Sequence, residues 1–178
     1  MRYLSRFCLA IMALITLNAH AQTASDSHQN EKLKPPSTFN RNLYPPEADA
    51  KAEIAAALRQ AQKDSKNVLL DFGATWCFDC HVLDNALHRP DLKSIVDENY
   101  LVVHVDVGQF DKNLDLCRKY DVPIEKGIPA LAVLDNSGKL LFSQKSGQFE
   151  SARSLTVNDV SAFLTKWKPS KTGSVGNK

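Results

Sequence analysis

The fold is decided by residues 68–81, which read Val-Leu-Leu-Asp-Phe-Gly-Ala-Thr-Trp-Cys-Phe-Asp-Cys-His. An apolar run that carries one carboxylate, Asp71, leads through a short bend to Cys77 and Cys80, which are separated by two residues. The apolar run is typical of a buried strand, and a helix is expected to begin near Trp76 or Cys77. This order of elements predicts two thiols at the start of a helix.

A helix start changes the chemistry of a thiol. Free backbone N–H groups and the positive end of the helix dipole point toward the residue that precedes the first turn. Both favour the thiolate of Cys77, which is the form that attacks a disulfide. Because only two residues separate the cysteines, Cys80 can reach back and release the mixed disulfide. We therefore expect Cys77 to attack and Cys80 to resolve.

Two segments resemble those of the thioredoxin superfamily. Residues 71–80 resemble its active-site segment, in which a buried Asp lies six residues before the first cysteine of Trp-Cys-x-x-Cys. Gly-Ile-Pro-Ala at residues 127–130 resembles its Gly-Ile-Pro-Thr segment, and the similarity runs from about Glu47 to Trp167. The resemblance implies an α/β, thioredoxin-like fold with a central mixed sheet of four to five strands flanked by helices. It also implies a thiol–disulfide oxidoreductase, with a reductase favoured and an oxidase or isomerase as the alternative.

The buried acid has a role in that family. There it takes and returns the proton of the resolving cysteine, which assigns this role to Asp71 and Cys80. An unpaired carboxylate in an apolar strand is costly to bury, so its pKa should be raised. The family often places a lysine beside this acid, whereas we expect Val102 or Val103 in that region. The alternative is a buried acid with a structural role only.

The resemblance also implies a surface for substrates. The proline of the family segment is cis, so Pro129 is expected to expose the backbone of Ile128, with which a substrate peptide can pair across Cys77. Trp76 is expected to pack beside the dithiol and to contribute to docking. The alternative is that Pro129 is an ordinary turn residue.

Phe78 and Asp79 fill the dipeptide that most tunes redox potential in this family. A negative charge on Asp79 would oppose the thiolate of Cys77 and raise its pKa, which favours the disulfide and hence a better reductant. Alternatively, Asp79 points into water at the helix start, or a protonated His81 offsets its charge.

Metal binding is a rival interpretation of the same residues. Cys77, Cys80 and His81 could hold copper or zinc, but the sequence offers no second cysteine pair and no evident fourth ligand. We therefore expect neither a metal nor an organic cofactor. A binding domain with an inert dithiol is a third possibility, and Cys117 is expected to be a buried apolar residue.

The first residues indicate export. Arg2 and Arg6 precede an apolar run at 7–17, and Ala19 and Ala21 supply the small residues that a signal peptidase reads. We expect a signal peptide at residues 1–21, cleaved after Ala21, and a periplasmic or secreted protein. The run is too short for a membrane span, which needs about 20 residues.

Composition and compartment set the expected partners. Loss of the two arginines leaves 20 basic against 20 acidic residues, so nothing indicates binding to nucleic acid. In an oxidising compartment a reducing dithiol needs an electron donor, for which a membrane disulfide reductase is a candidate. Substrates are expected to be disulfide-containing proteins or peptides, and the protein is expected to be a monomer.

The remaining pattern predicts the order of elements. Residues 22–46 are polar and expected to be flexible, held only near Phe39, Leu43 and Tyr44; residues 47–168 form the domain and residues 169–178 a disordered tail. Helices are expected at 47–63, 76–88, 91–99, 111–120 and 157–167, and strands at 68–72, 101–107, 130–134 and 139–143. Leu114 and Cys117 are expected to face inward. The connection at residues 121–126 is longer than in ordinary thioredoxin and is expected to shape the substrate groove.

Overall fold

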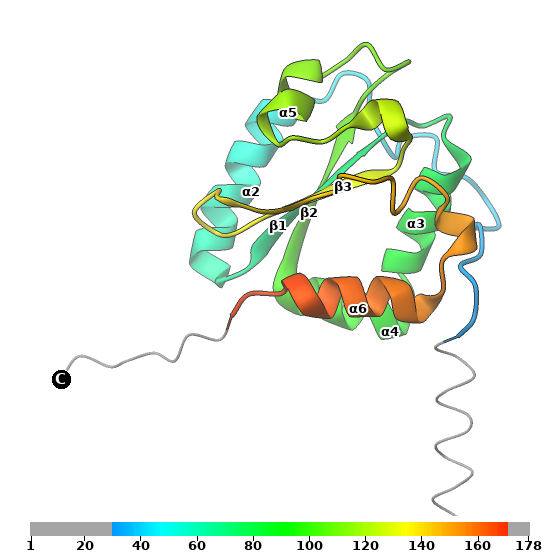
Figure 1. Cartoon of the computed structure of the whole chain (residues 1–178). Coiled ribbons are helices and arrows are strands. Elements are labelled where there is room, and N and C mark those ends of the chain that lie inside the picture. Colours follow the sequence, from blue (N-terminus) through cyan, green and yellow to red (C-terminus); the bar gives the residue numbers. More distant parts are fainter. Residues whose placement is uncertain (1–29, 171–178) are drawn as a thin grey trace, which may run out of the picture.

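The structure is a computed structural model in which residues 30–170 are described (Figure 1). The predicted signal peptide and residues 171–178 of the predicted tail lie outside these residues. In chain order, the elements are α2 (Ala50–Asp64), β1 (Asn67–Gly73), α3 (Phe78–Leu87), α4 (Pro90–Asn99), β2 (Tyr100–Asp106), α5 (Leu114–Lys119), η1 (Ile124–Lys126), β3 (Ala130–Leu134), β4 (Leu140–Ser143), η2 (Ala152–Ser154) and α6 (Val157–Trp167).

Within the described residues, the strands form one mixed sheet in the order β2-β1-β3-β4. Strand β1 runs parallel to β2 and antiparallel to β3, and β3 and β4 form an antiparallel hairpin. All seven residues of β1 are buried, because neighbouring strands flank it and helices cover both faces. The predicted α/β thioredoxin-like fold is confirmed.

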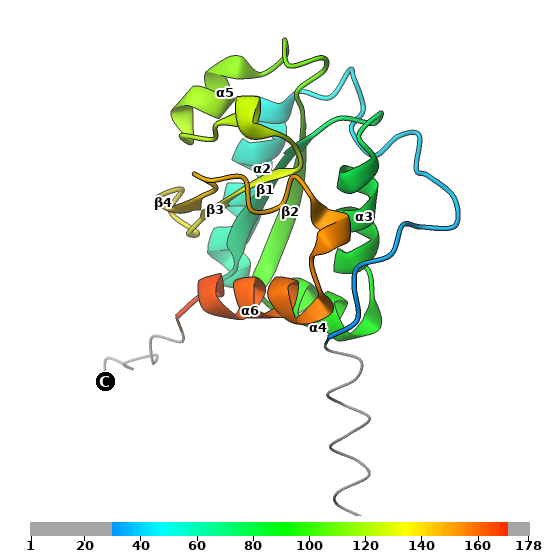
Figure 2. The ribbon, with the colours of Figure 1, turned by 45° about the vertical axis from the view of Figure 1, so that its right-hand side comes forward.

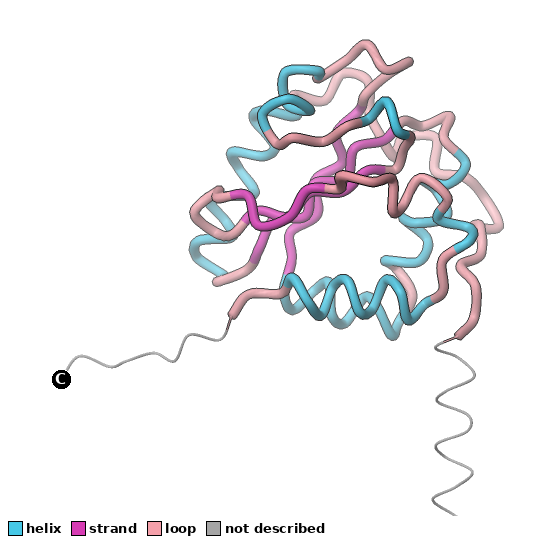
Figure 3. The backbone as a smooth tube through the Cα atoms, viewed as in Figure 1, coloured by secondary structure: helices cyan, strands magenta, loops and turns pink. Residues whose placement is uncertain are grey.

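The two faces of the sheet carry separate apolar clusters. Helices α2 and α5 lie over one face and α3, α4 and α6 over the other, as Figure 3 shows. Along β1, Val68 and Leu70 belong to the first cluster and Leu69 to the second, as the two-residue period of a strand requires. This alternation fixes which side chains of β1 face α3.

The β3–β4 turn and the start of α6 lie where the sequence predicted them. The β3–β4 turn runs through Asp135 to Gly138, and Asp135 Oδ1 accepts hydrogen bonds from the backbone N–H groups of Ser137 and Lys139. Gly138 has a φ of +86°, which glycine adopts without strain. Thr156 and Asp159 form the predicted capping box at the start of α6.

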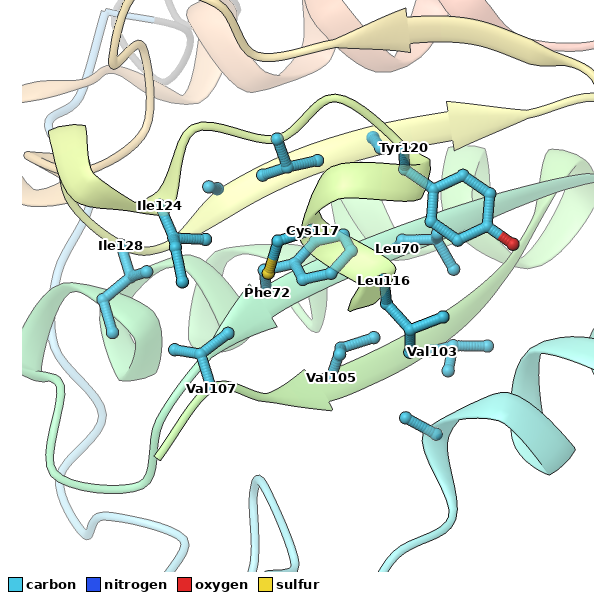
Figure 4. Close-up of a cluster of buried hydrophobic side chains, with 14 of the residues drawn as sticks. Leu70, Phe72, Val103, Val105, Val107, Leu116, Cys117, Tyr120, Ile124 and Ile128 are labelled. Atoms are coloured by element: carbon cyan, nitrogen blue, oxygen red, sulfur yellow. The ribbon is translucent and has the colours of Figure 1, made fainter. Parts of the chain in front are cut away.

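Helix α5 is shorter than expected. Residues 111–120 were the predicted range, but α5 begins only at Leu114, because Asn113 adopts left-handed geometry with a φ of +51°. The expectation that Leu114 faces inward is wrong, since it is 38% exposed. Leu116 points into the core instead, and Cys117 points there as expected, as Figure 4 shows. Burial raises the pKa of the Cys117 thiol to about 11.

Residues 30–46 lie along the domain. Lys32 pairs with Thr156 in an isolated bridge, the Leu33 N–H donates to the Leu155 carbonyl, and Asn85 Nδ2 donates to the Lys34 carbonyl. Figure 2 shows this segment passing outside α3. Leu33, Leu43 and Tyr44 are buried, so the segment that was expected to be flexible contributes side chains to the core.

No helix among residues 30–170 combines the length and the apolar character that a membrane span requires.

Candidate active site

Cys77 is the N-cap residue of α3. Its backbone is extended, and its Sγ accepts a hydrogen bond from the Cys80 N–H at 3.1 Å. The helix therefore begins one residue after Cys77, close to the expected position, because the bend at residues 74–76 ends where the thiol can cap the first turn. The two cysteines form a disulfide, with their Cα atoms 5.3 Å apart.

The two cysteines differ slightly in exposure. Cys77 keeps 4% of its surface exposed and Cys80 keeps none. Cys77 Sγ lies 3.5 Å from the carbonyl oxygen of Ile128, and the Ile128–Pro129 peptide bond is cis. The structure thus brings Cys77 next to the backbone that the resemblance assigned to substrate pairing, and it makes Cys77 the outer of the two cysteines.

Exposed aromatic side chains precede and follow Cys77 in the chain. Trp76 is 52% exposed, its Nε1–H donates to the Gly108 carbonyl at 2.9 Å, and its ring meets Phe110 edge-on. Phe78 is also exposed and meets the ring of Phe39 at 90°. These rings provide apolar area beside Cys77.

Asp71 is completely buried at the centre of β1. The Tyr44 hydroxyl donates to its Oδ2 at 2.8 Å, whereas Oδ1 has no hydrogen-bond partner among the described residues. Burial raises the pKa of Asp71 to about 6, and the charge of His104 and the Tyr44 hydrogen bond keep the pKa from rising further. The expected rise in pKa is present.

The expected neighbour of this acid was wrong. The parallel register pairs Asp71 with His104, and not with Val102 or Val103. His104 Nε2 lies 3.6 Å from Asp71 Oδ2 and 3.6 Å from Asp84 Oδ1 on α3, at ion-pair distance from both. Burial alone would lower the pKa of His104, but Asp84 and Asp71 outweigh it and the pKa is raised.

Asp79 has an arginine partner. Its carboxylate accepts from the Arg153 backbone N–H at 2.9 Å, and from Nε at 3.0 Å and Nη2 at 2.5 Å of the Arg153 guanidinium. Burial alone would raise the pKa of Asp79, but these contacts hold it below its ordinary value. The same guanidinium lies 4.5 Å from the centre of the Phe78 ring. Asp79 therefore does not point into water. Its charge was expected to oppose the Cys77 thiolate, with His81 as an alternative partner that would offset it, but the cation that pairs with Asp79 is Arg153.

Comparison with known proteins agrees with this geometry. A family model described as thioredoxin-like matches residues 49–136. The fold is similar to that of a disulphide isomerase from Xylella fastidiosa Temecula1, with a TM-score of 0.66 and 36% identity over 75% of this chain and 97% of that one. The chain belongs to the thioredoxin-like family.

A curated relative within this family is a thioredoxin from Buchnera aphidicola subsp. Baizongia pistaciae (strain Bp). It is 33% identical over 75 residues, which are 42% of this chain and 62% of that thioredoxin. The match thus spans less than two thirds of the relative's length.

The metal-binding alternative fits this thioredoxin-like site poorly. The Thr75 carbonyl can only accept, so His81 Nε2, 2.8 Å away, donates its proton there. The His81 ring stacks on Phe39. Within residues 30–170, no group of three potential ligands is arranged to hold a metal ion.

Three residues of the thioredoxin-like site were missed from the sequence: Tyr44, His104 and Arg153. His104 could have been found by counting register along two adjacent strands. Tyr44 lies in a polar segment without periodicity, and Arg153 is 74 residues from Asp79, so neither carried a local signal.

Proposed function

We propose that this protein is an exported thiol–disulfide oxidoreductase that reduces disulfides in protein or peptide substrates through Cys77 and Cys80. The observation that carries the proposal is the position of Cys77, which caps α3, accepts the Cys80 N–H and remains the outer cysteine beside Ile128. A thiolate there is stabilised by the helix start and reaches a disulfide laid along residues 128–129.

The reaction uses the two cysteines in turn. The Cys77 thiolate attacks one sulfur of the substrate disulfide, and the other sulfur leaves as a thiolate. Cys80 then loses its proton and attacks Cys77 Sγ, which releases the second substrate sulfur and forms the Cys77–Cys80 disulfide. Asp71, with a pKa of about 6, is the acceptor proposed for the Cys80 proton. An electron donor, such as a membrane disulfide reductase, restores the dithiol.

Substrate docking is assigned to the rim of the dithiol. An extended peptide would pair with the backbone at Ile128, in front of Pro129, and pack on Trp76 and Phe78. These rings supply apolar area without fixing a sequence, which suits recognition of varied protein substrates.

The charges around Cys77 support reduction over oxidation. A dithiol is strongly oxidising when its reduced form is strongly stabilised. Here the guanidinium of Arg153 is engaged by Asp79, so this nearby cation and anion cancel as a pair. The thiolate keeps the helix start and the Cys80 N–H as its stabilising contacts, to which a guanidinium paired with Asp79 adds little.

The reduction potential tests the direction. It is measured by equilibrating the Cys77–Cys80 pair with glutathione. We expect a value near that of thioredoxin, about −270 mV, and a value near that of a strong periplasmic oxidant, about −120 mV, would overturn the reductase assignment. Cys77→Ser should abolish reduction of insulin disulfides, and Cys80→Ser should trap substrates as mixed disulfides.

Disulfide isomerisation is the second candidate function. It is favoured by the 36% identity to the disulphide isomerase from Xylella fastidiosa Temecula1, of which this chain covers 97%. Isomerisation also begins with attack by the reduced nucleophile, so refolding of a scrambled multi-disulfide protein distinguishes the two. An isomerase restores native pairing catalytically, whereas a reductase leaves free thiols.

Export is proposed from the first 21 residues. Arg2 and Arg6, the following apolar run and the small residues Ala19 and Ala21 support a cleaved signal peptide. Mass spectrometry of the protein from a periplasmic fraction should find an N-terminus at Gln22. Recovery of the uncleaved chain in the cytosol would contradict this proposal.

A further inference from the structure

Tyr44 reaches the active site from outside the part of the chain that matches the family model, which begins at residue 49. Only 1% of its surface is exposed. Its backbone is held against the bend before Cys77, because its N–H donates to Thr75 Oγ1 at 3.3 Å and its carbonyl accepts from the same hydroxyl at 3.2 Å. The position of the ring is therefore fixed relative to the dithiol.

The Tyr44 hydroxyl touches the buried acid and lies close to the resolving sulfur. It donates to Asp71 Oδ2 at 2.8 Å. Gly73 follows Asp71 by two residues on β1, so any side chain there would point to the same side as Asp71. A Cβ atom on Gly73 would lie 2.3 Å from the Tyr44 hydroxyl oxygen and 2.9 Å from Cys80 Sγ. The hydroxyl and the sulfur thus occupy adjoining space over the same glycine.

A phenol hydroxyl suits this position chemically, since it donates one hydrogen bond and accepts others. Burial and the neighbouring charge of Asp71 raise the pKa of Tyr44, so the ring stays neutral when the carboxylate is ionised. A neutral hydroxyl can accept a proton on its oxygen while it gives its own to Oδ2.

We propose that Tyr44 relays the proton from Cys80 to Asp71 when the mixed disulfide is resolved, an inference that rests on the proposed thiol–disulfide exchange. The Cys80 S–H bond breaks, and its proton passes to the Tyr44 oxygen as the Tyr44 proton passes to Asp71 Oδ2. The electron pair left on Cys80 Sγ forms the bond to Cys77 Sγ. The bond from Cys77 to the substrate sulfur breaks, and the substrate leaves as a thiolate with that electron pair.

His104 provides the exit for the proton. Its Nε2 lies 3.6 Å from Asp71 Oδ2, its ring meets Tyr44 edge-on, and about a quarter of its side chain is exposed. The charged groups acting on the Tyr44 and His104 rings come from four elements: Asp71 on β1, Asp84 on α3, Asp106 on β2 and Glu53 on α2. Once His104 has released its own proton to water, its neutral ring can take the proton from Asp71, which restores the carboxylate.

The test uses Tyr44→Phe with Tyr100→Phe as the matched control. Tyr100 is another buried tyrosine whose hydroxyl donates to a backbone carbonyl, that of Leu164, at 2.6 Å. Each variant loses one buried hydroxyl and its hydrogen bond, but Tyr100 is bonded to α6 and not to the dithiol site. Loss of stability alone should therefore affect the two variants alike.

The readout is the resolution step alone. The protein is loaded at Cys77 with a coloured aromatic thiol as a mixed disulfide, and release of that thiol by Cys80 is followed against pH by stopped flow. We expect Tyr44→Phe to slow release by tenfold or more, a modest share of the roughly 10²–10⁴-fold that positioned proton transfer supplies. Tyr100→Phe should release the thiol at the wild-type rate.

The pH profile separates a relay from an indirect effect on Asp71. Loss of the Tyr44 hydrogen bond also raises the pKa of Asp71, but that effect disappears at pH values where the carboxylate is ionised in both proteins. A slower plateau at high pH supports the relay, whereas a shifted profile with an unchanged plateau overturns it.

A second test uses the wild-type protein, so its result does not depend on whether a variant folds. In mixtures of light and heavy water, a relay moves two protons and gives a curved dependence of the resolution rate on deuterium fraction, whereas direct transfer moves one and gives a straight line. A straight line would overturn the relay. Failure of the wild-type protein to release the thiol at all would instead refute the proposed function.

Discussion

Two carboxylates flank the dithiol, and their surroundings are opposite. Asp71 lies six residues before Cys77 and Asp79 two residues after it, and both are buried, with 0% and 7% of their surface exposed. Burial raises the pKa of Asp71 to about 6, because His104, 3.6 Å away, and the Tyr44 hydroxyl lower it only in part. Asp79 accepts hydrogen bonds from the guanidinium and the backbone N–H of Arg153, and these contacts lower its pKa.

The comparison shows that the partner, and not burial alone, decides the charge of a carboxylate. A carboxylate with a pKa of about 6 exchanges a proton near neutral pH, which suits the step at Cys80. A carboxylate held by arginine stays ionised, and its charge is compensated by the guanidinium. Four predictions test this contrast, from the largest expected effect to the smallest.

The largest effect should be on stability. Because the folded pKa of Asp71 is raised from 3.8 to about 6, its contribution to stability is fully present below pH 3.8 and is lost as pH rises through 6. The loss amounts to about 3 kcal/mol, at 1.36 kcal/mol per pKa unit. Asp71→Asn should therefore be more stable than wild type at pH 8, and the advantage should vanish near pH 4.

Denaturant unfolding of both proteins at several pH values measures this difference, and subtraction cancels the carboxylates that they share. Equal free energies of unfolding at pH 8 would mean that Asp71 is not destabilised by burial.

The same substitution should slow the reaction. Asp71→Asn keeps the shape of the side chain but cannot accept the Cys80 proton, so resolution of the mixed disulfide should fall about a hundredfold at neutral pH. Asp79→Asn is the matched control on the other side of the dithiol and should leave resolution within a fewfold of wild type. If both variants resolve the mixed disulfide equally fast, Asp71 is not the proton acceptor for Cys80.

Removal of the arginine should make the two carboxylates more alike. Arg153→Gln leaves the charge of Asp79 uncompensated, so the pKa of Cys77 should rise by about one unit and attack at neutral pH should slow up to tenfold. The absorbance of the Cys77 thiolate against pH measures this shift.

Two further variants serve as controls for this shift. Arg153→Lys retains the charge and should shift the pKa less, and the double variant Asp79→Asn/Arg153→Gln should return it toward wild type. A shift that persists in the double variant would mean that Arg153 acts through packing on Phe78 and not through charge.

The smallest effect should come from the histidine beside Asp71. His104 lowers the pKa of Asp71 through its charge, so His104→Gln should move the midpoint of the resolution profile to higher pH by about half a unit. His88→Gln is the matched control, since His88 is exposed and contacts Asp84 from the end of α3. An unchanged midpoint in His104→Gln would show that His104 carries no charge that lowers the pKa of Asp71.

The sequence predicted those parts of the fold that depend on short-range patterns. The apolar run at 68–72 lies within β1, and the capping box at Thr156 placed α6 at its observed bounds. Asparagine adopts left-handed geometry more readily than most residues, but this tendency alone does not end a predicted helix, so α5 was predicted too long.

The candidate site was predicted only as far as its local motifs reach. Cys77, Cys80 and Asp71 stand in one segment, and Pro129 stands in a second. The partners of the acids depend on contacts between distant segments: a strand register for His104 and a loop for Arg153. An error of one residue in the register between β1 and β2 places the neighbouring side chain on the opposite face of the sheet. Val103 was therefore among the residues expected beside Asp71, where His104 lies.

The path of residues 30–46 also determines where an N-terminal tag or fused domain lies relative to the dithiol. Arg89 makes an ion pair with Glu31 just beyond the C-terminal end of α3, whereas Cys77 caps its N-terminal end, about 15 Å away for ten helical residues. A tag, bead or neighbouring domain joined ahead of Glu31 would sit at the far end of this helix. The dithiol would then face outward from the point of attachment, so immobilised protein should keep its access to large substrates.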